Sequence, residues 1–214
     1  MHDVKLVAVT PDAEKSIVYM ARVSNPAGQT NTETSARLIR YLIKHKHWSP
    51  FEMASMAVEI NTSRAIAAQI LRHRSFSFQE FSQRYSSVED LRPLELPMLR
   101  RQDVKNKQAS HDDLDPELVK ELQTKIALHY DISQSLYLSL LGAGVAKECA
   151  REILPLGTPT RLYMAGTIRS WIHYLEVRCG VETQLEHRLV ANGIKEIFRK
   201  SLPSIYEAAF SSEV

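Results

Sequence analysis

A run of basic and aromatic residues near the middle of the chain has the composition of a binding site. Residues 72–85 read Arg-His-Arg-Ser-Phe-Ser-Phe-Gln-Glu-Phe-Ser-Gln-Arg-Tyr. Guanidinium groups are planar, permanently charged donors that match phosphate oxygens. Phe76, Phe78, Phe81 and Tyr85 add flat faces on which a ring could stack. The segment therefore predicts a pocket for a phosphorylated heteroaromatic ligand.

A simpler interpretation of the first two arginines is structural. A helix is expected over residues 64–71, and Arg72 and Arg74 follow it, where cations complement the negative end of a helix dipole. That role explains neither Ser82 nor Arg84, which a ligand site would use. We therefore favour the ligand site.

Further arginines in the second half of the chain are candidates for the same chemistry. Arg151 and Arg178 interrupt apolar surroundings, where an unpaired charge would be costly. Arg169 and His173 are four residues apart on an expected helix over residues 168–177, and hence on one face. On an uninterrupted helix Arg178 would point away from Arg169, so they share one cavity only if the helix ends first. For any single arginine, a surface ion pair is the commoner role.

Other catalytic and cofactor motifs are missing from the sequence. The seven glycines match neither the dinucleotide fingerprint nor the P-loop. His45 and His47 have no third metal ligand nearby, so we expect them on a surface loop and expect no metal. Cys149 and Cys179 are isolated, and Cys149 lies on the apolar side of a helical pattern, which favours a packing role.

The composition is that of an ordinary globular protein, with 44% apolar and 24% charged residues. The formal net charge of +2 argues against a general affinity for nucleic acid. No apolar run approaches the roughly 20 residues needed to cross a bilayer, and the N-terminus lacks a signal-peptide pattern. We expect a cytoplasmic protein with one domain over residues 1–214 and with neither a membrane nor a nucleic-acid partner.

Hydrophobic periodicity predicts a mixture of strands and helices. Strands are expected over residues 4–9 and 54–60, and helices start near residues 10, 32, 64, 115, 145, 168 and 182, the last followed by a short tail. An α+β fold follows, because the order lacks strict βαβ alternation. On the long helix from Asp115, the stripe Leu118, Leu122, Ile126, Leu136 and Leu140 is interpreted as core. The polar residues 100–113 predict a mobile loop.

Taken in order, these motifs resemble those of the flavin-dependent thymidylate synthases. Arg72-His73-Arg74, seven further residues and Ser82 match the family signature. Similar segments are His47-x-Ser49-Pro50-Phe51-Glu52, Val145-Ala146-x-x-x-x-Arg151-x-x-Leu154-Pro155, Arg169-Ser170-x-x-His173-x-Leu175-x-x-Arg178 and Gln184-x-Glu186. The resemblance covers most of the chain.

This resemblance implies a fold, an activity and partners. The fold would be α+β, with helices packed on a central antiparallel sheet, in a homotetramer whose active sites are shared between subunits. The reaction would be the reductive methylation of dUMP to dTMP. FAD would be the tightly bound cofactor, methylene-tetrahydrofolate the carbon donor and NADPH the reductant.

The resemblance also implies roles for the matching residues. Arg178 would bind the uracil ring and favour its ionised form, which enriches electrons at the carbon to be methylated. The flavin site would contain Ser49, Arg72, His73, Arg74, Glu80, Thr167, Ile168, Arg169 and His173. The dUMP site would contain Gln69, Ile70, Leu71, Arg72, Glu80, Phe81, Ser82, Gln83, Arg84, Arg151 and Arg178.

Three residues depart from the family pattern. Met53 stands where a histidine is frequent, and Gln79 and Thr167 stand where asparagine is frequent. These changes concern local flavin contacts and not the reaction class. Two alternatives stay open from the sequence. One is a single-strand nucleic-acid-binding module that uses residues 72–85, and the other is a flavin-binding relative without methylation activity.

Overall fold

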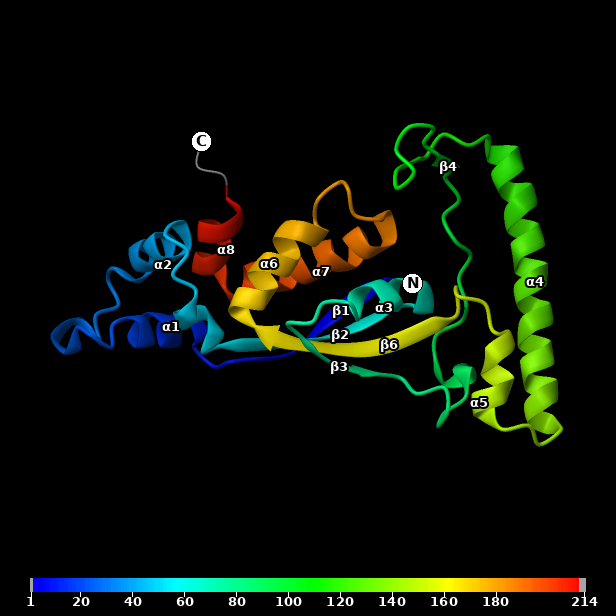
Figure 1. Cartoon of the computed structure of the whole chain (residues 1–214), viewed down its shortest axis with the longest axis horizontal. Coiled ribbons are helices and arrows are strands. Elements are labelled where there is room, and N and C mark those ends of the chain that lie inside the picture. The colour runs from blue at the N-terminus through cyan, green and yellow to red at the C-terminus, as the bar shows by residue number, and fades with distance from the viewer. Residues whose placement is uncertain (1, 212–214) are drawn as a thin grey trace. The chain divides into compact units, whose positions relative to one another are not determined.

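The computed structural model describes residues 2–211, so residues 1 and 212–214 of the predicted domain lie outside the described chain. Helices and strands alternate irregularly along it (Figure 1). The strands are β1 (Asp3–Val9), β2 (Ser55–Ser63), β3 (Ser77–Glu80), β4 (Arg101–Gln102), β5 (Ser110–His111) and β6 (Pro159–Thr167). The α-helices are α1 (Ala13–Ala21), α2 (Ser35–Lys44), α3 (Arg64–Ile70), α4 (Pro116–Gly142), α5 (Lys147–Ala150), α6 (Ile168–Arg178), α7 (Leu185–Ser201) and α8 (Pro203–Phe210). Short 3-10 helices are η1 (Pro26–Gly28), η2 (Ser49–Glu52), η3 (Val88–Asp90) and η4 (Arg151–Ile153).

The main sheet has the strand order β1-β2-β6-β3. Glu59 of β2 accepts a hydrogen bond from Tyr163 of β6, and Asn61 accepts one from Arg161. Residue numbers rise along one strand as they fall along the other, which identifies the pair as antiparallel. The predicted α+β fold with helices on an antiparallel sheet is confirmed.

The chain divides into two compact units. Residues 2, 61–70 and 80–162 form what we call the first unit, and residues 3–60, 71–79 and 163–211 form the second unit. One domain was expected from the sequence, because the sequence contains no shift in composition that marks this division.

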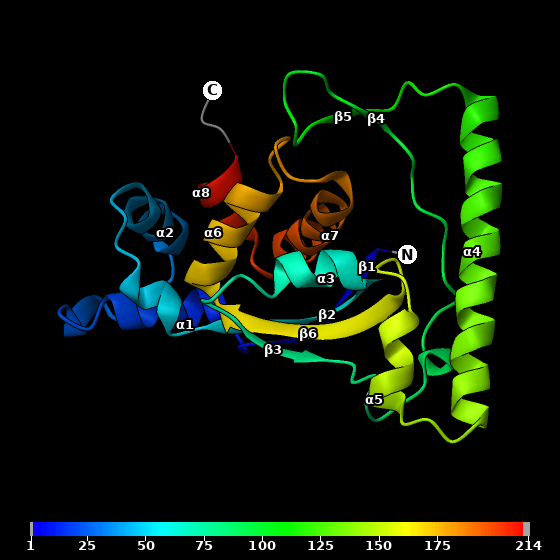
Figure 2. The ribbon, with the colours of Figure 1, turned by 45° about the vertical axis from the view of Figure 1, so that its right-hand side comes forward.

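The core of the second unit is built on strand β2 and helices α6 and α7. Ala54, Met56, Val58 and Ile60 are at most 2% exposed, as their period-two pattern predicted. Trp171 of α6 is buried among them, and its indole Nε1 donates to the Met56 carbonyl at 2.9 Å. Helix α7 packs on β1 and on α6, and Figure 2 shows α6 and α7 side by side.

Helix α8 forms where the sequence predicted only a tail. Pro203 opens it, because proline lacks the amide hydrogen that a first helical turn leaves unbonded. Glu14 of α1 accepts hydrogen bonds from the Ile205 amide and the Ser204 hydroxyl, each at 2.9 Å. This anchor lies far away in sequence, which is why a local pattern did not reveal the helix.

The start of α1 differs from the prediction, whereas α3 begins at Arg64 as predicted. Helix α1 begins at Ala13, after Asp12 in a left-handed conformation, and Thr10 accepts instead from the Ser55 amide at 3.0 Å. Thr62 belongs to β2, and the hydroxyl of Ser63 accepts from the Ile66 amide at the start of α3. At Thr10 the neighbouring strand β2 thus binds the hydroxyl that could otherwise cap the helix.

Helix α4 dominates the first unit but buries little of its surface. Asp115 caps it by accepting from the Leu118 amide at 3.0 Å, as predicted. Only Ser133 and Tyr137 are buried on this helix, whereas Leu118 and Leu136 are 42% and 47% exposed. The interpretation of this stripe as core is therefore wrong within one chain. Although α4 has 27 residues, none of the described helices is long and apolar enough to cross a membrane.

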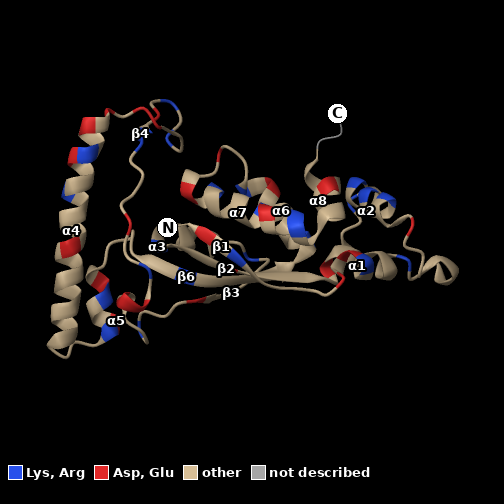
Figure 3. Ribbon diagram, turned by 180° about the vertical axis from the view of Figure 1, so that it is seen from behind, with Lys and Arg blue, Asp and Glu red and all other residues tan. Residues whose placement is uncertain are grey.

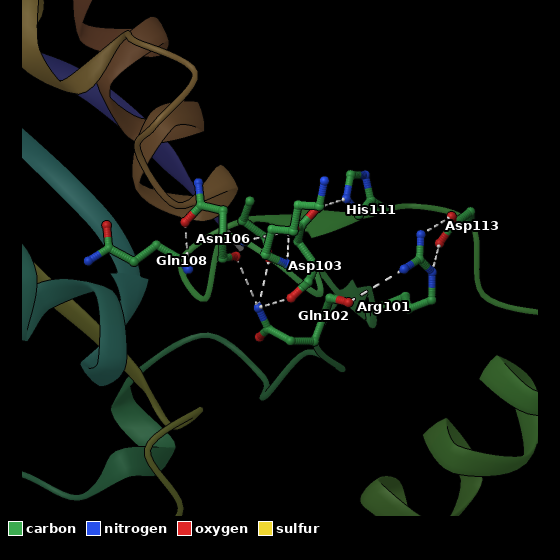
Figure 4. A network of polar contacts seen from close by, with 9 residues as sticks. Arg101, Gln102, Asp103, Asn106, Gln108, His111 and Asp113 are labelled. Atoms are coloured by element: carbon green, nitrogen blue, oxygen red, sulfur yellow. Dashed lines mark hydrogen bonds and ion pairs between the residues drawn. The ribbon is translucent and has the colours of Figure 1, made fainter.

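The segment 100–113 forms an antiparallel hairpin of β4 and β5, drawn in Figure 4. Arg101 and Asp113 form an ion pair at 2.6 Å, and His111 contacts Asp103 at 2.6 Å. Hydrogen bonds from His111 and from two backbone amides lower the pKa of Asp103 to about 2. These contacts order a segment that has no apolar pattern, and its mobility stays a prediction.

We predict that Gly166→Ala destabilises the fold. An added Cβ would lie 2.5 Å from the ring of Phe76, which is held in place by Trp171. Overpacking of this kind costs about 1–3 kcal/mol in the free energy of unfolding, measurable by denaturant titration. Gly142→Ala is the matched control, because a Cβ there meets no atom within 4 Å. Equal stability of both variants would contradict the packing argument.

Candidate functional site

Helix α6 carries several of the predicted site residues. Thr167 caps it, with its hydroxyl accepting from the Ser170 amide at 3.3 Å. Arg169 and His173 follow on one exposed face, and Arg178 is the last residue of the helix. Helical spacing places Arg178 on a different side from Arg169, as expected.

Arg178 is held by His73 within the second unit. The guanidinium Nε donates to Nε2 of His73 at 2.9 Å. Nε2 must therefore present a lone pair, so the imidazole is neutral and carries its proton on Nδ1. Burial, followed by the positive charges of Arg178 and His173, lowers the pKa of His73 to about 4. The two terminal nitrogens of Arg178 have no acceptor among the described residues, which leaves that end of the guanidinium available for a ligand.

A buried aromatic wall supports His73. The ring of Tyr174 lies edge-on to His73 with centroids 4.9 Å apart. The Tyr174 hydroxyl lies 3.1 Å from Nε2 of His187, which is fully buried on α7. Burial lowers the pKa of His187 to about 4 and raises the pKa of Tyr174. The sequence analysis missed both residues, although a tyrosine next to His173 and a histidine on an apolar helix face were available signals.

A cavity of about 400 Å³ lies against the exposed face of α6. Arg169, Ser170 and His173 line it together with Glu52, which forms an ion pair with Arg169, and with Glu176. Two carboxylates and one paired guanidinium do not favour a diphosphate. Hydroxyl, imidazole and carboxylate groups instead match the mixed donors and acceptors of a polar ring system.

The remaining predicted flavin residues have varied surroundings. Ser49, Arg72 and Arg74 are exposed, and the two arginines form no hydrogen bond or ion pair among the described residues. Ile168 is 0% exposed, so only its backbone can reach a ligand. Glu80 belongs to the first unit.

In the first unit, the last residue of β3 and the segment that follows it are held by hydrogen bonds. Glu80 accepts from the Thr160 hydroxyl at 2.9 Å, and the Phe81 amide donates to the Arg161 carbonyl at 2.8 Å. Gln83 is buried, and its carbonyl oxygen accepts from Arg64 at 3.2 Å. Its amide nitrogen has no acceptor in the described chain. A buried donor without a partner costs free energy, so this amide nitrogen is available to donate a hydrogen bond to a ligand.

Two guanidiniums lie close to this segment. Arg84 donates to Glu148 of α5 at 3.0 Å in a largely exposed pair. Arg151 comes three residues after Glu148 in a continuing helical turn, and hence on the same side. Exposed ion pairs contribute only about 0–1 kcal/mol, so an incoming phosphate could replace Glu148 at little cost.

The other predicted dUMP residues differ in how far they are exposed. Gln69 and Phe81 are half-buried, Ser82 is exposed and Ile70 is fully buried, so Ile70 can offer only backbone. Leu71 is exposed in the second unit, beyond the end of α3.

Two expectations about individual residues are wrong. Phe76 is not a stacking platform, because it packs in the core against Trp171 and Tyr174. Cys149 has no packing role, because it is exposed. Among the described residues, no group of histidines, cysteines and acids could hold a metal ion.

Comparisons with known proteins show which family the chain resembles. Residues 5–204 match the family model described as thymidylate synthase complementing protein. A probable flavin-dependent thymidylate synthase of Paramecium bursaria Chlorella virus 1 is 52% identical over 95% of this chain and 97% of that relative. A flavin-dependent thymidylate synthase of Synechocystis is 51% identical over 91% of this chain and 88% of that relative. The crystal structure of the UMP/dUMP methylase PolB from Streptomyces cacaoi, bound with 5-Br dUMP, has a TM-score of 0.84 and 26% identity, and covers 97% of this chain and 94% of that one.

The fold and these similarities thus define an α+β enzyme. The family model matches residues 5–204, which is nearly the whole chain, and this match identifies the family. The chain belongs to the thymidylate synthase complementing protein family, whose named relatives are flavin-dependent thymidylate synthases. The enzyme interpretation therefore replaces that of a nucleic-acid-binding module.

The half-buried His73 and the buried His187 predict a pH dependence of stability. Each takes up a proton near pH 6.5 when unfolded but only near pH 4 when folded. Between these values the unfolded chain binds more protons, so the free energy of unfolding falls as the pH decreases through this window. We expect a loss of about 1–3 kcal/mol for each histidine, with the lower end for the partly exposed His73.

Denaturant titrations at about pH 4.5 and about pH 7 measure this loss. The variant His187→Gln should lose less stability on acidification than the wild type. The exposed histidine of α4 supplies the control His129→Gln, which should behave like the wild type. If His187→Gln lost as much stability on acidification as the wild type, protonation of His187 would not be the cause.

Proposed function

We propose that this protein catalyses the reductive methylation of dUMP to dTMP. The observation that carries the proposal is Arg178, whose Nε is fixed by a neutral His73 while its other nitrogens have no acceptor in the described chain. The names of the relatives, and the dUMP analogue bound to the structural neighbour, support the same reaction.

Arg178 binds the uracil ring and stabilises its ionised form. A guanidinium beside a ring imide lowers the free energy of the anion, which places negative charge on the ring. That charge is shared with the carbon to be methylated, so the carbon becomes the nucleophile. His73 keeps the guanidinium plane fixed before the substrate arrives, which avoids reorganisation during the reaction.

Residues of the first unit hold the phosphate and ribose of dUMP. Arg84 and Arg151 bind the phosphate, with Arg84 exchanging Glu148 for it. The buried amide nitrogen of Gln83 donates to dUMP, and Ser82 adds a hydroxyl. Glu80, Phe81 and Gln69, with the backbone of Ile70, complete the part of the proposed set that belongs to this unit, and Leu71 and Arg72 of the second unit are its other members.

The donor set of the second unit fits FAD. Arg169, His173 and Thr167 suit its polar ring system at the cavity, with Ile168 contributing backbone. The exposed Arg72 and Arg74, with Ser49, suit its phosphates, and Glu80 joins from the first unit. Bound FAD would supply the hydride-transfer chemistry. We propose methylene-tetrahydrofolate as the carbon donor and NADPH as the reductant.

The working form is a homotetramer with active sites shared between subunits. Leu128, Ile132 and Leu136 recur every four residues on the exposed side of α4, with exposed fractions of 62%, 58% and 47%. Such a stripe on a long helix favours burial against another chain. Sharing also accounts for Arg72 and Arg74, which form no hydrogen bond or ion pair among the residues that the structure describes.

We predict that Arg178→Ala reduces thymidylate formation by about 10²–10³-fold or more, because the charge on the ring loses its partner. Flavin absorbance of the purified variant should stay near that of the wild type. Tritium release from labelled dUMP, with the folate and NADPH present, measures the activity. Arg199→Ala removes an exposed arginine paired with Glu196 and is the control that should keep full activity. Equal turnover in Arg178→Ala would refute the role of ring activation.

For the assembly, we predict that Leu128→Glu/Ile132→Glu dissociates the tetramer, because two buried carboxylates would replace apolar contacts. Sedimentation velocity measures the mass. Thr32→Glu/Gln108→Glu adds the same charge at exposed positions elsewhere and should leave the tetramer intact. A wild type that sediments as a monomer would contradict the proposal.

A further inference from the structure

Helix α2 carries a basic face that has no part in the site described above. Arg37, Arg40 and Lys44 recur at helical spacing with Tyr41, and all four are exposed. Figure 3 shows basic positions along α2 in blue. Ile39 and Leu42 lie on the opposite side of the helix and are buried. We call Arg37, Arg40, Tyr41 and Lys44 the basic face of α2.

The charges of this face are not neutralised by the described chain. None of its three cations forms a hydrogen bond or ion pair there. No Asp or Glu occurs between Glu33 and Glu52, so helix and following turn contain no internal counter-charge. Some exposed cations of other elements have a carboxylate within one helical turn, as Lys15 has Asp12 and Lys125 has Glu121, whereas the basic face of α2 gathers three cations without one. A cluster of uncompensated cations raises the local potential and attracts an anion.

Aromatic rings extend the face toward the cavity of the second unit. Tyr41 lies 4.3 Å from the ring of His45, and His45 lies 6.2 Å from that of His47. The next residue, Trp48, lines the cavity of about 400 Å³. The residues from Tyr41 to Trp48 thus connect the basic face to the cavity proposed for the flavin ring, so the anionic tail of a co-substrate bound beside the flavin could reach this face.

We propose that the basic face of α2 binds the poly-γ-glutamyl tail of the folate co-substrate. This inference rests on the proposed use of a folate. Each added γ-linked glutamate carries one free carboxylate, which Arg and Lys can pair with. The face from Arg37 to Lys44 is about 10 Å long, from a rise of 1.5 Å per residue, and spans only a few such carboxylates. Single-stranded nucleic acid needs a groove for at least about four nucleotides, so the short face favours the tail.

Calorimetric titration of the full-length protein with two oxidised folates tests the proposal. Pteroylpentaglutamate should bind about tenfold more tightly than pteroylmonoglutamate at low salt, with the advantage shrinking as salt screens the charges. In Arg37→Gln/Arg40→Gln/Lys44→Gln the two ligands should bind equally, with the affinity for the monoglutamate unchanged. The control Lys105→Gln/Lys107→Gln/Lys120→Gln removes the same charge from exposed positions and should keep the preference.

Equal binding of both folates to the wild type overturns the inference, as does an equal loss in both triple variants. Free penta-γ-glutamate separates this result from the proposed function. If it binds through the basic face while the monoglutamate does not bind and no dTMP forms, the anion site stands and the proposed reaction falls. Binding of a single-stranded oligonucleotide through α2, without binding of penta-γ-glutamate, overturns the inference in favour of nucleic acid.

Discussion

The second unit depends on keeping one imidazole neutral beside a permanent positive charge. Nε2 of His73 can accept from Arg178 only while it carries no proton. A protonated His73 would place two cations within 2.9 Å and would release the guanidinium. Burial beside Tyr174 prevents this, because removing an imidazolium from water costs more than removing a neutral ring. The orientation of Arg178 therefore depends on core packing. A substitution of Tyr174 or His187, which form the wall beside His73, would change both the packing and the orientation of Arg178.

Local periodicity was sufficient wherever an element buries one face against its own chain. Strand β2 alternates buried and less buried residues, and α6 buries Ile168, Trp171, Ile172 and Leu175 at helical spacing, so both were predicted within a few residues. The same reasoning failed on α4. Its leucines follow a helical stripe, but a sequence cannot tell whether the surface that covers a stripe belongs to the same chain or to another. The spacing of the apolar residues thus predicted the helix correctly, but it wrongly predicted that their side chains are buried within the chain.

The candidate site was predictable where motifs are contiguous and not where contacts are distant. Residues 72–85 stand out by composition alone. The partnership of His73 with Arg178 joins residues 105 positions apart, and that of Tyr174 with His187 requires two helices to pack. Phe76 illustrates the opposite error. It has the residue type and sequence neighbours of a stacking platform, but the structure buries it against Trp171 and Gly166. Composition predicts which groups are present, whereas packing decides which of them reach a ligand.

The departures from the family pattern follow the same division between backbone and ligand roles. Thr167 replaces a frequent asparagine, yet either side chain accepts the amide hydrogen bond that starts α6, so the helix and its arginines keep their position. Met53 differs, because a thioether cannot make the strong hydrogen bonds of an imidazole. It is 58% exposed and follows Glu52 of the cavity, so any contact it makes with a ligand or a neighbouring chain is apolar. The hydrogen-bonding side chains of this cavity therefore include Arg169 and His173, whereas residue 53 next to it offers only an apolar surface.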